Sequence, residues 1–154
     1  MKLHLFCVGK LRGAAERALC EEYLARLQRY GPVALTETSA AKSAEPAKGR
    51  TEECNALLKS MDAAKLSRVW ILEERGKQVT SKGLAEKVVG LENQSTKSLG
   101  LVLGGAYGLD ERVKARGELW ALASLTFPHE LCRVVLLEQL YRARTIQRGE
   151  PYHH

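Results

Sequence analysis

Three glycines follow an apolar run in "LVLGGAYGLD", the stretch from Leu101 to Asp110. Glycine allows a positive φ and lets a ligand approach the bare backbone. In open α/β sheets, ligands bind outside the carboxyl ends of the strands. The stretch therefore predicts a loop that binds a cofactor or a substrate, although a plain turn between a strand and a helix would use the same residue types. Its spacing matches neither GxGxxG nor GxxxxGK[ST], the two common phosphate-binding patterns.

A second stretch, "ALASLTFPHELCRVVLLEQLYRA", runs from Ala121 to Ala143. Its first half combines small and hydroxyl residues, beside which backbone amides and carbonyls could enclose a flat heterocycle. A strand end that leads into a helix would give the same pattern. In the apolar second half, Glu138 precedes Arg142 by four residues, the order that favours an ion pair on a helix. This pair indicates either a structural salt bridge or an arginine that faces a phosphate or an anionic transition state.

The chain ends in "RGEPYHH", which places Tyr152 and His153 next to each other. Histidine is the side chain whose ordinary pKa suits proton transfer near neutral pH. Chain ends are commonly frayed, so the same residues would also suit an unstructured end.

The elements that must position these stretches follow from the hydrophobic pattern. We expect five strands, over Lys2–Gly9, Val33–Thr38, Arg68–Glu73, Leu99–Leu103 and Glu118–Leu122. We expect helices over 13–30 and 51–64, from Thr80 or Ser81 to Glu92, briefly after Asp110, and from Pro128 or His129 to Gln147. Ser39–Arg50 is expected to be a mobile basic loop, and Glu74–Lys77 a turn. Alternating strands and helices predict an α/β fold with a mostly parallel sheet and helices on both faces.

Length and charge narrow the class of protein. The 154 residues suit a single domain, 1–154, and carry a formal net charge of +6. A basic chain favours an anionic partner, most commonly nucleic acid. The chain has neither an apolar run of membrane-spanning length nor a signal-peptide pattern, so we expect a cytoplasmic protein and no membrane partner. Its four cysteines form no CxxC pair, which predicts free, mostly buried thiols and no metal site.

Taken together, these stretches resemble one bacterial family. "LGGAYGL", Trp120, "LASLTFPHELCRVVLLEQLYRA" and "GEPYHH" follow one another in that order, after "MKLHLFCVGK" and "LEERGK". Over essentially its whole length the sequence is similar to the H-type large-subunit ribosomal RNA methyltransferases, which belong to the SPOUT superfamily. The resemblance implies a homodimer whose α/β fold carries a C-terminal trefoil knot, and S-adenosylmethionine bound in that knot.

The resemblance also implies which residues hold the cofactor. They lie on three separate segments of the chain: Leu72, Gly104, and Leu122, Ala123, Ser124, Leu125, Thr126 and Phe127. Gly105 and Gly108 would shape the glycine-rich loop. Backbone groups in an apolar slot can read adenine, so the side chains at positions 123 and 124 can vary.

The reaction implied is methylation of N3 of a pseudouridine in helix 69 of 23S rRNA, position 1915 in the usual rRNA numbering. Because the sulfonium methyl is already activated, the enzyme mainly has to position it in line with N3. The N3 proton must also leave, and His153 is the best candidate to take or relay it. Arg142 would stabilise negative charge on the base or hold a phosphate, and Tyr152 completes the expected catalytic group.

No separate RNA-binding domain is apparent in the sequence. Six basic residues are candidates for contact with RNA phosphates: Lys42, Lys48, Arg50, Arg133, Arg144 and Arg148. We therefore expect the dimer and the assembled ribosome to supply the remaining recognition.

Two other functions remain open at this stage. A factor that binds RNA or the ribosome without catalysis would share the basic charge. A related SPOUT enzyme that acts on another nucleotide would share the motifs. A nucleotide-dependent dehydrogenase is disfavoured, because the glycine spacing and the acidic residue expected for ribose binding are wrong for it.

Overall fold

The computed structural model describes residues 1–153, and His154 lies outside the described residues. The elements alternate as expected: β1 Lys2–Val8, α1 Ala14–Gln28, β2 Val33–Thr38, α2 Pro46–Ala64, β3 Arg68–Gln78, α3 Ser81–Asn93, β4 Ser98–Leu103, α4 Glu111–Lys114, β5 Glu118–Ala121 and α5 His129–Arg148. The strands form one sheet in the order β2-β1-β4-β3-β5, and every neighbouring pair is parallel. The predicted α/β class and parallel sheet are confirmed, and the trefoil knot stays a prediction.

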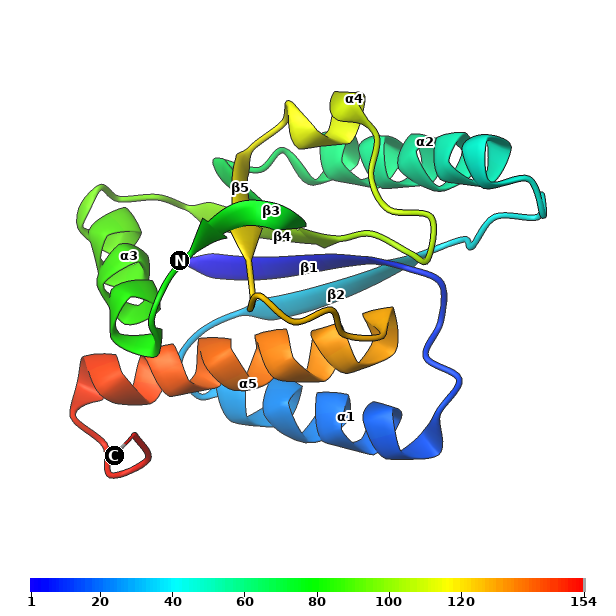
Figure 1. Ribbon diagram of the computed structural model, residues 1–154. Coiled ribbons are helices and arrows are strands. Elements are labelled where there is room, and N and C mark those ends of the chain that lie inside the picture. The colour runs from blue at the N-terminus through cyan, green and yellow to red at the C-terminus, as the bar shows by residue number, and fades with distance from the viewer. Residues whose placement is uncertain (154) are drawn as a thin grey trace.

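Helices cover both faces of this sheet (Figure 1). On one face α1, α3 and α5 pack on Leu5, Leu101 and Trp70, and on the other α2 and α4 pack on Phe6 and Val102. Successive strand residues point to opposite faces, so apolar residues at neighbouring positions of β1 and β4 serve two separate cores. Leu99, Leu101 and Val102 are at most 1% exposed, as expected for the central strand.

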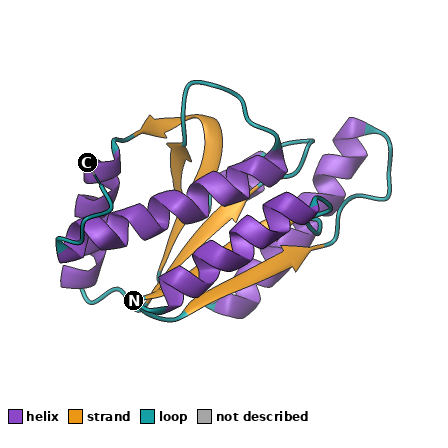
Figure 2. Ribbon diagram, turned by 90° about the horizontal axis from the view of Figure 1, so that it is seen from below, coloured by secondary structure: helices purple, strands orange, loops and turns teal. Residues whose placement is uncertain are grey.

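Helices α1 and α5 lie side by side along the sheet (Figure 2). Their amino ends are joined by Glu130, whose carboxylate accepts from the backbone amides of Arg12 (3.2 Å) and Gly13 (3.5 Å). Near their carboxyl ends, the Tyr30 hydroxyl donates to the Glu150 carboxylate at 2.5 Å. Hydrogen bonds at both ends therefore fix the register of the two helices.

Two of the expected boundaries are wrong. The basic segment before residue 51 is not a loop throughout, because α2 already begins at Pro46. Proline suits the first turn of a helix, where its missing N–H is not needed. Gly49 then permits close packing, since a Cβ there would lie 2.5 Å from the ring of Tyr107.

The expected turn after Glu73 is instead an irregular continuation of β3. Both Leu72 and Lys77 pair with Trp120, so the residues between them bulge out of the ladder. A Cβ on Gly76 would lie 2.5 Å from the backbone of Trp120. The residue at which β3 approaches β5 again must therefore be glycine.

Two further findings concern thiols and membranes. All four cysteines are free, and Cys7, Cys20 and Cys54 are buried, as the sequence predicts. Among the described residues, no helix combines the length and the apolar character that crossing a membrane requires.

Candidate functional site

The expected cofactor segments converge at the carboxyl edge of the sheet. Leu72 of β3 pairs with Leu103 of β4 on one side and with Trp120 of β5 on the other. Each of these strands continues into a segment singled out in the sequence: the β3 bulge, the glycine-rich loop after Leu103, and the segment that follows Ala121. Register in a parallel sheet therefore brings together three stretches that span about 50 residues of the chain, from Leu72 to Leu122.

A cavity of about 720 Å³ opens between the β3 bulge and the glycine-rich loop. A smaller one, of about 330 Å³, lies between the bulge and the segment Leu122–Phe127. Leu72, Phe127 and Cys132 line both cavities, so the two are parts of one site. Its size lies in the range of pockets that take small ligands.

The glycine-rich loop forms one wall of this site. Gly104 lies close to Leu109, since a Cβ on Gly104 would approach that side chain to 3.0 Å. Gly108 has a φ of +73°, which only glycine adopts without strain. The loop ends at Asp110, whose carboxylate accepts from the amides of Arg112 and Val113 and caps α4. Burial alone would raise the pKa of Asp110, but its hydrogen bonds, above all the one from the Arg112 side chain, lower it.

The segment Leu122–Phe127 forms the opposite wall. Leu125 is 76% exposed, so its side chain does not contribute to the core. Ser124 accepts a hydrogen bond from the Gln78 amide at 3.3 Å, which attaches the segment to the end of β3. Phe127 lines both parts of the site, and α5 begins directly after it.

Several charged residues at the larger cavity had not been singled out from the sequence as site residues. Arg75 and Lys114 line it together with the predicted Arg50. Lys114 pairs with Glu73 at 3.0 Å, and this hydrogen bond raises the pKa of the lysine. Arg75 belongs to the motif "LEERGK". Because residues 74–77 were expected to form a turn, the position of Arg75 at the cavity was not predicted.

The expected catalytic residues form a separate group, which we call the tail cluster: Glu138, Arg142, Tyr152 and His153. The Arg142 guanidinium donates to Glu138 at 2.6 and 3.1 Å, lies 4.7 Å from the centre of the Tyr152 ring and 3.4 Å from Nδ1 of His153. Its bond to Glu138 raises the pKa of Arg142. The tail is therefore folded back on α5 rather than frayed.

Tyr152 is held in this cluster as a hydrogen-bond donor. Its hydroxyl donates to Glu138 at 3.1 Å and lies 3.5 Å from the Tyr23 hydroxyl. Burial, together with these two hydrogen bonds, raises the pKa of Tyr152. The phenol therefore stays protonated near neutral pH and cannot act there as a base.

Within one chain, the tail cluster and the cofactor segments do not meet. Helix α5 begins at His129, next to the cofactor segment, and Arg142 lies 13 residues further along it. At 1.5 Å per residue this separation is roughly 20 Å. Figure 1 shows the chain end at the opposite end of α5 from the loop that leads into the helix.

Two of the six arginines and lysines expected to contact RNA are buried. Arg133 is 2% exposed and donates to Glu37 (2.8 Å) and to the carbonyls of Val8 (2.5 Å) and Gly9 (2.6 Å). Arg144 is 4% exposed and donates to Glu92 at 2.6 Å. The expectation is wrong for both, because their guanidinium groups are used inside the protein. The helical period places them on the inner face of α5, which the charge of a single residue does not reveal.

The other four cationic side chains are exposed. Lys42, Lys48 and Arg50 lie on or just before the first turns of α2, where Lys48 pairs with Glu45 at 2.9 Å. Arg148 lies near the end of α5, with its guanidinium 5.1 Å from the centre of the Tyr30 ring. They therefore occupy two separate regions of the surface.

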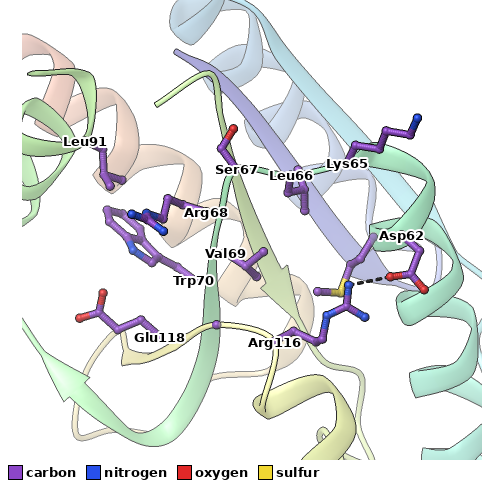
Figure 3. Close-up of a pocket in the computed structure, with 12 residues that line it drawn as sticks. Asp62, Lys65, Leu66, Ser67, Arg68, Val69, Trp70, Leu91, Arg116 and Glu118 are labelled. Atoms are coloured by element: carbon purple, nitrogen blue, oxygen red, sulfur yellow. Dashed lines mark hydrogen bonds and ion pairs between the residues drawn. The ribbon is translucent and has the colours of Figure 1, made fainter. Parts of the chain in front are cut away.

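A further hollow of about 560 Å³ lies at the amino ends of β3 and β5 (Figure 3). Arg116 and Asp62 pair there at 2.6 Å, and the Lys65 side chain points away from them. No residue that lines this hollow also lines the two cavities at the carboxyl edge, so it is not part of the candidate site.

The fold and the site define a class: a parallel α/β protein with a small-molecule pocket at the carboxyl edge of its sheet. A family model described as a predicted SPOUT methyltransferase matches residues 1–153. The chain therefore belongs to the SPOUT methyltransferase family. It is 40% identical over 154 residues to the ribosomal RNA large subunit methyltransferase H of Pelobacter propionicus, with all of both chains covered.

Other relatives agree in fold or in name. The protein of the same name from Geobacter metallireducens is 41% identical, with 100% of this chain and 99% of that protein covered. A putative methyltransferase from Legionella pneumophila, solved with bound SAM, has a TM-score of 0.52 and 14% identity over 93% of this chain and 66% of its own. A probable methylase family protein from Haemophilus influenzae has a TM-score of 0.56 and 14% identity over 99% of this chain and 70% of its own.

Proposed function

We propose that this protein is an S-adenosylmethionine-dependent methyltransferase that modifies N3 of the pseudouridine at position 1915, in helix 69 of 23S rRNA. The observation that carries the proposal is the convergence of Leu72, Gly104 and Leu122–Phe127 on one site at the carboxyl edge of the sheet. The full-length similarity to large-subunit rRNA methyltransferases supports the substrate. Action on ribosomes implies the cytoplasm.

The site suits the cofactor. Its walls are the glycine-rich loop and the segment Leu122–Phe127, whose backbone groups could bind adenine. Leu72 and Phe127 supply apolar surface beside them. The bound cofactor would supply an activated methyl group on a sulfonium, and the protein would orient that methyl group toward the base.

The tail cluster would act on the base. Arg142, charged and 25% exposed, can stabilise negative charge on the pseudouridine or hold a neighbouring phosphate. His153, with Nδ1 3.4 Å from that guanidinium, can accept the N3 proton or pass it to solvent. Tyr152 would keep the tail folded by donating to Glu138.

A homodimer would bring the two groups together. The face formed by α1 and α5 carries two exposed leucines, Leu19 (42%) and Leu131 (39%). If this face contacts its copy across a two-fold axis with the α5 helices antiparallel, each tail cluster lies beside the cofactor segments of the partner. The active site would then consist of residues from both subunits.

Recognition of the RNA would use Arg50 at the cavity, with Lys42 and Lys48 beside it and Arg148 near the tail. Because these cations are few and scattered, we propose that the assembled ribosome, rather than free rRNA, presents the target. Equal rates of methylation on purified 23S rRNA and on assembled ribosomes would contradict this part.

The decisive experiment is mass mapping of rRNA nucleosides in a strain that lacks the gene. We expect loss of one methyl group, at N3 of that pseudouridine, and its return with a plasmid copy. Loss of a methyl group at another nucleotide would instead identify a SPOUT enzyme of different specificity. An unchanged map, together with no binding of S-adenosylmethionine in calorimetry, would favour the non-catalytic binding factor.

A further inference from the structure

A buried carboxylate lies directly behind the glycine-rich loop. Glu53, on α2, is 4% exposed. Its Oε1 accepts from the amide of Ala41 at 3.2 Å, but its Oε2 has no hydrogen-bond partner among the described residues. A buried carboxylate oxygen without a partner costs free energy, so its presence requires an explanation.

The free oxygen faces Gly105. A Cβ on Gly105 would lie 2.7 Å from Glu53 Oε2 and 2.9 Å from Val8. Gly105 in turn lines the cavity of about 720 Å³. The carboxylate is therefore separated from the cavity by the thickness of one backbone segment that has no side chain.

The loop is also held against α2 at a second position. The Tyr107 ring packs on Gly49, and the Tyr107 hydroxyl donates to the carbonyl of Ser43 at 3.5 Å. Glu53 and Gly105 are thus kept together by contacts on both sides. A ligand in the cavity would meet the same electrostatic environment each time it binds.

The other charges at this cavity are exposed or already paired. Glu73 pairs with Lys114, and Glu74 lies next to Arg75 with an exposed side chain. Glu53 is the carboxylate behind the cavity wall that has no cation within ion-pair distance among the described residues. A charge in the interior acts more strongly than one in water, because solvent screens it less.

We propose that Glu53 determines which charge state of the cofactor the site prefers. Its unpaired oxygen would attract the positively charged sulfonium of S-adenosylmethionine across Gly105. In the proposed reaction the bond between sulfur and the methyl carbon would break and its electron pair would stay on sulfur. N3 would bond to the methyl carbon as the N3 proton passes to His153 or to solvent. The product, S-adenosylhomocysteine, has a neutral sulfur that Glu53 does not attract, and it leaves more readily. This specificity role depends on the proposed placement of the cofactor.

The test compares the affinities of the two forms by calorimetry on the full-length protein. In Glu53→Gln we expect binding of S-adenosylmethionine to weaken on the order of tenfold, because the charge is lost while the shape is kept. Binding of S-adenosylhomocysteine should change less than about twofold by the same reasoning. Glu53→Asp keeps the charge but withdraws it from Gly105. The preference of this variant for S-adenosylmethionine over S-adenosylhomocysteine should lie between those of the wild type and Glu53→Gln. This variant also serves as the test if glutamine prevents folding.

The matched control is Glu52→Gln. Glu52 neighbours Glu53 and also binds the backbone of the same segment, accepting from the amide of Lys42 at 2.8 Å, but it is exposed. We expect both affinities of this variant to equal those of the wild type. If Glu53→Gln weakens both forms of the cofactor equally, or Glu53→Asp behaves as the wild type, the residue has only a structural role and the inference fails. A wild type that binds neither form would overturn the proposed function itself.

Discussion

Two arginines of α5 show how position decides what the same side chain does. Arg133 is buried and satisfies the carbonyls at the end of β1, whereas Arg142 is partly exposed and paired within its own helix. Removal of a buried charge partner leaves polar groups unpaired in the interior, but removal of a partly exposed i,i+4 partner does not.

We therefore expect Arg133→Ala to lower the free energy of unfolding by about 3 kcal/mol or more. Arg142→Ala should lower it by less than about 1 kcal/mol, while the proposed methyl transfer is lost. Urea denaturation monitored by tryptophan fluorescence, with a methyl-transfer assay, separates the two effects. Full activity of Arg142→Ala would remove that residue from the proposed mechanism.

Tyr30 should make stability sensitive to alkaline pH. Burial and the hydrogen bond to Glu150 raise its pKa to about 12 from an ordinary value of 10.0. Between these values the unfolded chain loses the phenolic proton while the folded chain keeps it, so the stability contributed by Tyr30 is complete below pH 10 and falls as the pH rises. Thermal melts from pH 9 to 11 should show a smaller loss for Tyr30→Phe than for the wild type. Parallel pH dependence in the two proteins would contradict this assignment.

Among the elements, the second stretch of pairing between β3 and β5, which follows the bulge, depends on Gly76. A Cβ there would collide with the Trp120 backbone at 2.5 Å, so Gly76→Ala should destabilise the protein by about 2 kcal/mol or more and weaken cofactor binding. Gly90, inside α3, has no heavy atom within 4 Å of its Cβ position. Gly90→Ala should therefore stabilise by about 0.5–1 kcal/mol. Urea denaturation of both variants measures the two changes in the free energy of unfolding. Similar changes for Gly76→Ala and Gly90→Ala would contradict these predictions.

The sequence predicted the number and order of these elements, because each strand is a short apolar run and each helix carries its own period. It also predicted that one helix starts at Thr80 or Ser81 and another after Asp110, and Thr80 and Asp110 cap these helices. It did not predict the bulge of β3, because the pairing of Leu72 and Lys77 with the same Trp120 depends on a strand that comes about 45 residues later.

The candidate site was likewise predicted only in part from the sequence. The loop at Gly104 and the segment Leu122–Phe127 were found from motifs, and the register of the sheet brings them together. The position of Glu53 was not apparent, because a single acidic residue in an amphipathic helix is usually exposed. Only the packing of Gly49 and Gly105 against neighbouring groups reveals its environment.

For the molecule as a whole, the exposed cations should govern the salt dependence of the proposed ribosome binding. The variant with Lys42, Lys48 and Arg50 replaced by alanine should reduce the slope of log K against log salt by roughly 2, if all three contact phosphates. Filter binding over a range of salt concentrations measures the slope. The control is replacement of Lys65, Arg68 and Arg116, which lie at the amino edge of the sheet. It should leave the slope unchanged. Equal slopes for the wild type and the first variant would show that Lys42, Lys48 and Arg50 do not contact RNA phosphates.

If the active site is shared between two subunits, as proposed, mixed dimers provide a further test. Arg142→Ala removes the tail function. Gly104→Val would press on Leu109, 3.0 Å from the Cβ position, and displace the glycine-rich loop. Neither variant alone should therefore be active. Random exchange of subunits places half of the chains in hybrid dimers, each with one intact site, and should restore about a quarter of the wild-type rate. No recovery, in a mixture whose subunits demonstrably exchange, would mean that each chain completes its own site.

The position of β1 between β2 and β4 also affects how the protein is made. Leu3 pairs with Leu99, so β1 needs a neighbour that is synthesised 96 residues later. At common translation rates, that delay is roughly 5 to 20 s. During this time one edge of an apolar strand stays unpaired and open to aggregation. The nascent chain should therefore depend on chaperones that shield the β1–β2 pair until β4 emerges.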